Sequence, residues 1–194
     1  MKKFWEEELN ELIFLQLVES KLPYSEINEH FADCIKHINS RTGTPMNISL
    51  STSYHWSSND VEGSAGIEPK DGSVVITLFV PAIMDLFDFL TFSNFPHWRE
   101  AFQTHCIILF MHEMEHLRKD TPTQKHIDIA EESRAWAETC RYTIAPLVEK
   151  YHLPLISNDA NMYYAWKESA GDANSEVWKL AIEKLYWDLD GKVN

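Results

Sequence analysis

The chain has 194 residues, of which 44% are hydrophobic, while glycine and proline together number only 14 (6 + 8). This composition fits one folded domain and excludes collagen-like repeats and low-complexity disorder. With 17 basic and 30 acidic residues, the formal net charge is −13. So acidic a surface repels phosphate backbones and anionic lipids, which argues against a nucleic-acid binder or a membrane-surface binder.

Cysteine usage and hydropathy bear on the compartment. Cys34, Cys106 and Cys140 lie far apart and form no C-x-x-C pair. This pattern predicts buried, reduced thiols rather than a disulfide framework or a thiolate zinc site. No apolar run reaches the roughly 18 residues that a membrane span needs, and no cleavage site follows the short apolar stretch 12–18. We therefore expect a soluble, cytoplasmic protein.

The N-terminal part of the chain, residues 1–40, predicts two helices. Apolar residues recur at helical spacing over 4–20. A second helix is expected to start after a cap at Ser25 and to run to about Asn39. His30 and His37 lie seven residues apart on this second helix, and we expect both at the surface.

A change of pattern at residue 46 indicates strands. Residues 47–52 alternate between polar and apolar, as a strand does. Residues 66–68, the turn 69–72 and residues 73–80 are typical of a hairpin. Residues 73–80 form a nearly continuous apolar run, which predicts a strand covered on both faces. We expect these strands to form a small antiparallel sheet.

Beyond Pro81 the chain predicts only helices, at 82–90, 97–119, 124–150, 161–169 and 174–189. Helices, a small antiparallel sheet and further helices together make an α+β fold. The predicted organisation is a single domain, 1–194, with N-terminal helices (1–40), a catalytic core (46–150) and a C-terminal helical extension (155–194).

The helix 97–119 contains the motif His112-Glu113-x-x-His116. Histidines four residues apart lie on one face of a helix, so two imidazoles can converge on one metal ion. Glu113 is close enough to accept a proton from a water molecule on that metal. Chance gives only about 0.04 such motifs in a chain of this composition. His105 lies on the same face, where we expect a packed core histidine rather than a group that supports the metal site.

The motif resembles that of the zincin metallopeptidases, and specifically the gluzincin branch, over roughly residues 64–148. In that family a downstream helix supplies a glutamate as the third zinc ligand, followed three residues later by an alanine that lets the two helices approach. Glu132 and Ala135 match this spacing. Glu132 also lies on one largely apolar stripe with Trp136 and Leu147, which predicts that it points inward.

The resemblance implies a zincin-like fold and a zinc metallopeptidase that hydrolyses polypeptides. His112, His116 and Glu132 would hold Zn²⁺, and Glu113 would be the general base for a water molecule that the metal activates. The strand 73–80 would be the edge strand that lines the cleft and pairs with an extended peptide. The group that stabilises the oxyanion stays open among five candidates, which are Tyr142, Tyr151, His152, Tyr163 and Tyr164.

Other third ligands stay open beside Glu132. Glu131 is adjacent but lies on a more polar flank of the helix. A histidine ligand, as in the Spartan-like DNA-repair proteases, would have to be His126 or His152, and His126 lacks the glycine that usually follows in that family. Asp128 would be an aspzincin-type ligand, but the motif that flanks it in those enzymes is missing.

The match with zincins has one notable departure, a charged residue inside the motif. Glu115 stands where zincins usually have an uncharged residue, and we expect it to face away from the histidines and to be solvated. The metzincin branch is excluded, because Lys119 and Pro122 occupy the positions of its glycine and histidine.

Two other classes of function compete with a peptidase. One is a non-catalytic zincin-fold protein for binding or regulation, with a structural metal or none. The other is a di-iron bundle, which would use Glu113-x-x-His116 together with a second E-x-x-H motif and which we disfavour. In a peptidase, the N-terminal helices could also cover the cleft as a built-in inhibitor.

Overall fold

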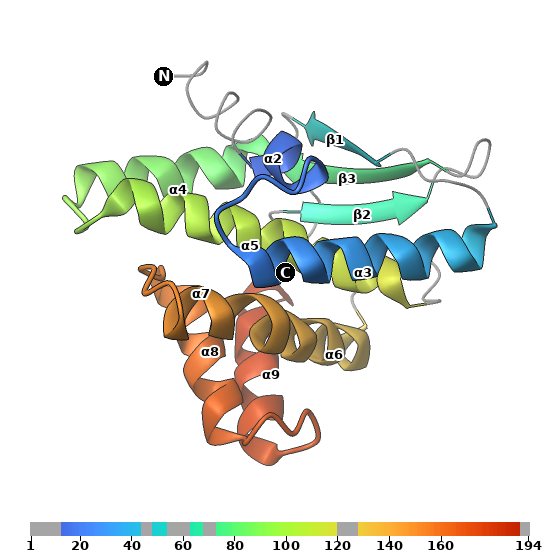
Figure 1. Cartoon of the computed structure of the whole chain (residues 1–194). Helices are drawn as coiled ribbons and strands as arrows, with labels where there is room; N and C mark the ends of the chain where they lie inside the picture. The colour runs from blue at the N-terminus through green and yellow to red at the C-terminus, as the bar shows by residue number, and fades with distance from the viewer. Residues whose placement is uncertain (1–12, 44–47, 54–62, 68–72, 120–127, 191–194) are drawn as a thin grey trace.

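The computed structural model describes residues 13–43, 48–53, 63–67, 73–119 and 128–190. This part of the chain is a mixed α+β structure, mostly helical, with a small sheet of three strands. In chain order (Figure 1), its elements are α2 (Leu15–Val18), α3 (Ser25–Thr42), β1 (Ile48–Ser53), β2 (Gly63–Ile67), β3 (Val74–Phe79), α4 (Val80–Phe92), α5 (Trp98–Arg118), α6 (Ile129–Thr139), the π-helical turn η2 (Cys140–Ile144), α7 (Ala145–Glu149), α8 (Ser157–Glu168) and α9 (Glu176–Asp190).

The sheet has the strand order β1-β3-β2. β2 and β3 form the expected antiparallel pair, with Gly63 opposite Leu78, but β1 runs parallel to β3, with Ile48 opposite Val74. The sheet is therefore mixed, and the prediction of an antiparallel sheet is wrong for β1. The prediction of 73–80 as an edge strand is also wrong, because β3 is central and β2 lies at an edge. Hydropathy indicates how a strand is covered, but it does not fix the order of strands.

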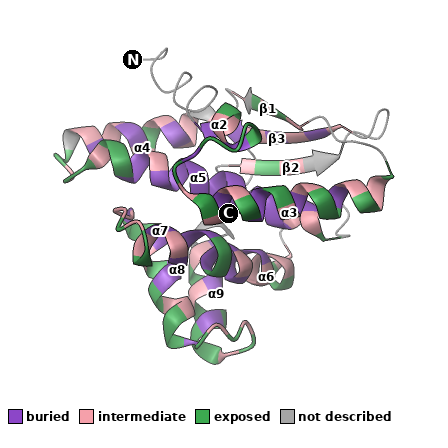
Figure 2. Ribbon diagram, in the orientation of Figure 1, coloured by how far each residue is buried: buried purple, intermediate pink, exposed green. Residues whose placement is uncertain are grey.

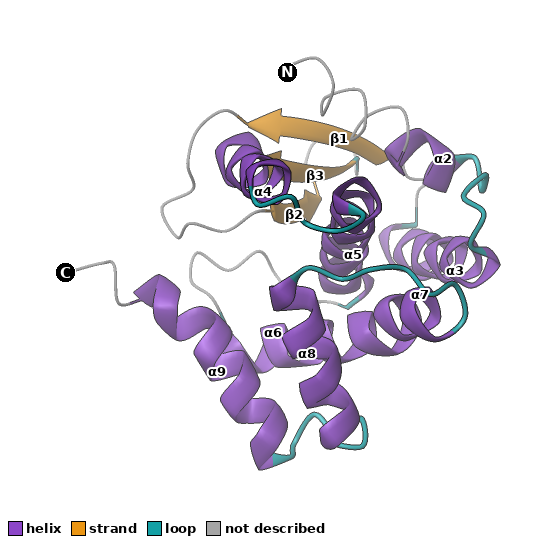
Figure 3. Cartoon of the chain, turned by 90° about the vertical axis from the view of Figure 1, so that its left-hand side faces the viewer, coloured by secondary structure: helices purple, strands orange, loops and turns teal. Residues whose placement is uncertain are grey.

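Helix α5 lies in the middle of the molecule, between the sheet and the C-terminal helices (Figures 1 and 3). Its bounds agree closely with the predicted helix 97–119. Fifteen of its 21 residues are buried (Figure 2), which explains why its sequence is apolar on nearly every face. Neither α5 nor any other described helix is both long enough and apolar enough to cross a membrane.

The predicted helix 124–150 is one continuous helical segment from Ile129, and residues 124–127 lie outside the described part of the chain. Its central turn, η2, has π-helical geometry between α6 and α7. α9 packs against α6, and the indole nitrogen of Trp178 on α9 donates to the Ser133 hydroxyl at 3.0 Å. The C-terminal helices are thereby joined to the segment that carries the predicted third ligand.

Helix α3 is tied to the far end of this same segment. The hydroxyl of Tyr151, just beyond α7, accepts from the Ser25 backbone nitrogen at 3.1 Å, and Glu26 pairs with Lys150. α3 ends at Thr42, about one turn beyond the predicted end, and its C-cap is Gly43, whose φ of +70° favours glycine. The predicted helix 4–20 falls mostly outside the described residues, which begin at 13 and include α2.

Candidate metal centre

Three side chains from two helices meet at one point beneath the sheet. His112 and His116 come from α5, and their Nε2 atoms lie 3.2 Å apart. Glu132 comes from the first turn of α6, and its Oε2 lies 3.2 Å from Nε2 of His112 and 3.4 Å from Nε2 of His116. Ala135 is completely buried, and its small side chain suits a close approach of α6 to α5. The structure thus brings together the three residues predicted as ligands.

The triangle has the dimensions of a zinc site. Ligand atoms about 2.0–2.2 Å from a tetrahedral Zn²⁺ lie roughly 3.3–3.6 Å from one another, which is close to the three observed separations. Two imidazole nitrogens and one carboxylate oxygen are also a donor set that Zn²⁺ accepts. The residues present therefore fit the metal that the resemblance implies.

The tautomer of His112 is set by Thr139 on α6. The Thr139 hydroxyl donates its one proton to the carbonyl of Ala135, at 2.7 Å. The same oxygen lies 3.4 Å from Nδ1 of His112, where it can only accept. The ring proton of His112 is therefore placed on Nδ1, which leaves the Nε2 lone pair for the centre of the triangle.

His116 is oriented in the same way by Glu131. Oε1 of Glu131 lies 3.3 Å from Nδ1 of His116, so Nδ1 donates and Nε2 faces the other two donor atoms. Arg134 fixes Glu131 with two hydrogen bonds, one of them 2.9 Å from Nε to Oε2, and donates to the carbonyl of Glu115 at 2.8 Å. Glu131, the alternative third ligand, thus lies on the opposite side of the imidazole from the triangle.

The histidines and carboxylates of the triangle shift one another's pKa values. Burial opposes a charge on His116, but the carboxylates of Glu132, Glu113 and Glu131 outweigh it and raise the pKa of His116 to about 9. Burial by itself would raise the pKa of Glu132. The hydrogen bonds and charges of His112 and His116 outweigh burial and hold the pKa of this carboxyl well below its usual range. Three converging acceptor atoms need a positive charge between them, either a proton or a metal ion. The same negative potential that retains the proton attracts a divalent cation.

Glu113 lies beside the triangle, under the edge strand β2. It is 5% exposed, and burial raises the pKa of its carboxyl to about 7. A Cβ atom on Gly63, the first residue of β2, would lie only 3.2 Å from Oε1 of Glu113 and 3.2 Å from Cδ2 of Leu78. Glycine at position 63 therefore lets the strand approach Glu113 closely.

An aromatic pair that the sequence analysis missed adjoins Glu132. The hydroxyl of Tyr186, on α9, donates to Oε2 of Glu132 at 2.5 Å and accepts from Nε1 of Trp136 at 3.0 Å. Burial, and then the charge of Glu132, raise the pKa of Tyr186 well above its usual value, so the phenol keeps its proton. The Trp136 ring also stacks on the His112 ring, with centroids 4.2 Å apart.

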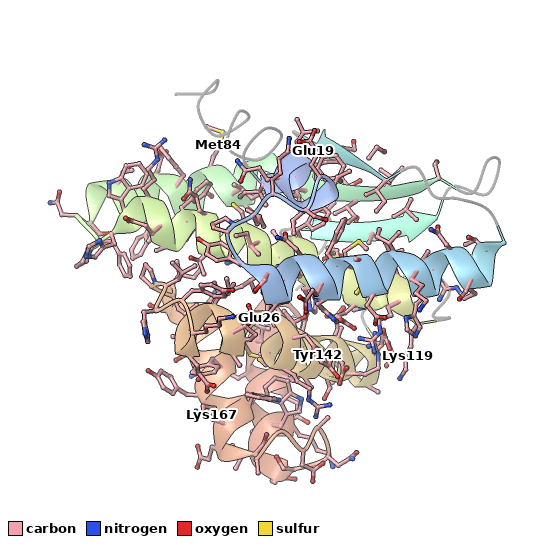
Figure 4. The ribbon with its side chains drawn as sticks, viewed as in Figure 1. Glu19, Glu26, Met84, Lys119, Tyr142 and Lys167 are labelled. Atoms are coloured by element: carbon pink, nitrogen blue, oxygen red, sulfur yellow. The ribbon has the colours of Figure 1, made fainter. Side chains whose placement is uncertain are left out.

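Glu115 faces away from the histidines, as expected, but the prediction that it is solvated is wrong. It is fully buried. Nε2 of His30 lies 2.6 Å from its Oε1, and Arg118 and Arg134 supply positive charge at 3.3 and 3.7 Å. His30 is buried as well, beneath the ring of Tyr142, which lies between α3 and α6 (Figure 4). The prediction of a surface position is wrong for His30, whereas His37 is exposed.

His30, Cys34 and Glu115 form a second group with metal-ligand atoms close together. Cys34 Sγ lies 3.7 Å from Nε2 of His30. However, two guanidinium groups already neutralise Glu115, so a divalent cation here would be repelled by Arg118 and Arg134. The charges make this cluster an ion-pair network that joins α3, α5 and α6, rather than a second metal site.

The other predicted candidates lie in various places. Asp128 caps α6 and accepts from the Ala130 nitrogen at 3.0 Å. His105 is buried and paired with Asp159 at 3.0 Å, as a core histidine would be. His126 lies outside the described residues. Of the oxyanion candidates, Tyr142 stacks on His30, Tyr151 donates to Glu26 and Tyr163 donates to Glu149. Tyr142, Tyr164 and His152 are exposed at the surface.

Comparisons with known proteins do not assign this chain to a family. No protein-family model, curated protein or solved structure matches it. The geometry of the centre therefore carries the functional argument on its own.

Proposed function

We propose that the chain is a zinc-dependent metallopeptidase of the zincin type, similar to the gluzincins. The observation that carries this proposal is the triangle of donor atoms from His112, His116 and Glu132, which has the size of a zinc ligand set. Glu113 follows the first ligand and lies beside the triangle, where a general base is needed.

Each residue has a defined task in this proposal. Zn²⁺, when bound, lowers the pKa of a coordinated water toward about 7 and polarises a substrate carbonyl. His112 and His116 bind as neutral imidazoles, with their Nδ1 protons held by Thr139 and Glu131. Glu113 accepts the proton of the attacking water and passes it to the leaving amine nitrogen, a task that suits its position between the triangle and the edge strand β2.

The position of β2 supports a polypeptide as the substrate. β2 is an edge strand in the described sheet, and its first residue is in contact with Glu113. An extended peptide that pairs with this edge would bring its backbone carbonyls alongside Glu113. The acidic chain, with a net charge of −13, favours basic or neutral peptides over acidic ones.

Metal content is the first test. Purified wild-type protein should contain one zinc ion per chain by elemental analysis, and His112→Ala should contain none. His37→Ala is the matched control, because His37 is an exposed histidine, and it should retain one zinc ion. A wild-type protein that takes up no zinc, even when reconstituted, would contradict the proposal.

Hydrolysis is the second test. New peptide termini should appear when zinc-loaded protein is incubated with a mixed peptide library and the products are read by mass spectrometry. Glu113→Gln should abolish them without loss of zinc, whereas Glu100→Gln, an exposed glutamate on the same helix, should not. Stoichiometric zinc without cleavage of any peptide would favour the alternative, a non-catalytic protein of this fold with a structural metal.

A further inference from the structure

The oxygen of Glu132 that faces the two histidines is also the oxygen that Tyr186 binds. Oε2 lies 3.2 Å from His112 and 3.4 Å from His116, and it accepts the Tyr186 hydroxyl at 2.5 Å. A carboxylate oxygen has two lone pairs, so it can bind a metal with one and accept from a phenol with the other. The hydrogen bond can therefore persist while Glu132 acts as a ligand.

The phenol is itself fixed in place. Nε1 of Trp136 donates to the Tyr186 oxygen at 3.0 Å. The hydroxyl therefore accepts one hydrogen bond from the indole and directs its own proton toward Glu132. Trp136 lies one helical turn after Glu132 on α6, and its ring also stacks on His112. One indole thus restrains two of the three donor residues, His112 directly and Glu132 through Tyr186.

We infer that Tyr186, on the C-terminal helix α9, is a positioning residue of the metal centre: its hydroxyl holds Oε2 of Glu132 in the orientation that completes the ligand triangle. The inference rests on the proposed zinc site. Groups that orient ligands in this way typically change metal affinity 10- to 100-fold when they are removed. The C-terminal helix therefore belongs to the centre, although it contributes no ligand.

The test is the zinc affinity of Tyr186→Phe, which removes the hydroxyl and keeps the ring. Affinity is measured for the full chain by competition with a chromophoric zinc chelator. We expect the dissociation constant to rise at least about tenfold. Tyr163→Phe is the matched control: Tyr163 is another buried tyrosine of the C-terminal helices, and its hydroxyl binds Glu149. Its affinity should stay within about twofold of wild type.

A second readout separates a positioning role from a general loss of structure. The visible absorption of Co²⁺ bound in place of zinc reports the arrangement of the ligands. This spectrum should change in Tyr186→Phe and stay the same in Tyr163→Phe. Trp136→Phe, which keeps an aromatic ring and removes the donor to Tyr186, should shift the affinity in the same direction, and it serves as the test if Tyr186→Phe does not fold.

The outcomes distinguish the inference from the proposed function. Zinc affinity and a Co²⁺ spectrum unchanged in Tyr186→Phe, with normal binding by wild type, would overturn the role of Tyr186 alone. The same holds for Trp136→Phe in the fallback experiment. A wild-type chain that binds neither zinc nor Co²⁺ would overturn the zinc site and, with it, the inference.

Discussion

The buried pair of Glu115 and His30 gives a prediction that does not depend on metal binding. Glu115→Ala removes a fully buried carboxylate and leaves His30 without its partner at 2.6 Å. Breaking a buried ion pair costs about 3–5 kcal/mol. Arg118 and Arg134 keep second carboxylate partners, in Glu138 and Glu131. We therefore expect the lower end, a loss of about 3 kcal/mol in the free energy of unfolding.

The assay is urea unfolding, followed by tryptophan fluorescence, of wild type, Glu115→Ala, His30→Ala and the double variant. A charge-assisted hydrogen bond contributes about 1.5–3 kcal/mol, so we expect a coupling energy of about 2 kcal/mol between the two positions. For a chain of this length, a 3 kcal/mol loss lowers Tm by roughly 6–12 °C. His37→Ala, at an exposed histidine of the same helix, should change stability by less than about 0.5 kcal/mol.

The reasoning fails if the two substitutions are additive. A coupling energy below about 0.5 kcal/mol would mean that His30 and Glu115 do not interact in solution as they do in the structure. A loss of stability in Glu115→Ala that His30→Ala does not share would then have to come from the arginines.

Three further predictions concern the metal, the edge strand and the acid range. At a free zinc concentration of 100 Kd, binding adds about 2.7 kcal/mol to the free energy of unfolding. Removal of zinc with EDTA should therefore lower the calorimetric Tm by roughly 5–11 °C. An unchanged Tm would argue against a zinc site. Gly63→Ala should lower kcat about tenfold with zinc affinity unchanged, because the added Cβ displaces Glu113; equal kcat values would refute the close approach. Lys150 and Tyr151 lower the pKa of Glu26 from its usual 4.5 to about 2. The resulting stability is complete above pH 4.5 and is lost as the pH falls toward 2, so unfolding free energies measured across this range should fall less steeply for Glu26→Gln than for wild type.

Local patterns predicted the elements that carry the centre. Helix α5 is apolar on almost every face, and this identified a buried helix with nearly correct bounds. The inward direction of Glu132 followed from its apolar stripe, because residues three and four apart on a helix share a face. Both inferences concern neighbours along one helix, where periodicity determines direction.

Contacts between distant segments could not be predicted in this way. The burial of Glu115 depends on His30, 85 residues earlier, and nothing in the sequence near Glu115 indicates that partner. The parallel pairing of β1 with β3 likewise depends on how the chain crosses between strands. The inward direction of Tyr186 could have been predicted, because it lies at helical spacing with Trp178 and Ile182, which are both fully buried. A tyrosine on an apolar stripe needs a partner for its hydroxyl.

The spacing of the ligands along the chain has a consequence for the order of folding. The three proposed ligands fall within 112–132, whereas the Tyr186 hydroxyl reaches Glu132 from 54 residues further on. Closing a loop of about 20 residues costs less entropy than closing a longer one, so the α5–α6 pair can assemble first. A cation captured by that pair would hold two helices together before the C-terminal helices dock. Helix α9, which is synthesised after that pair, would then add precision to a centre that has already formed.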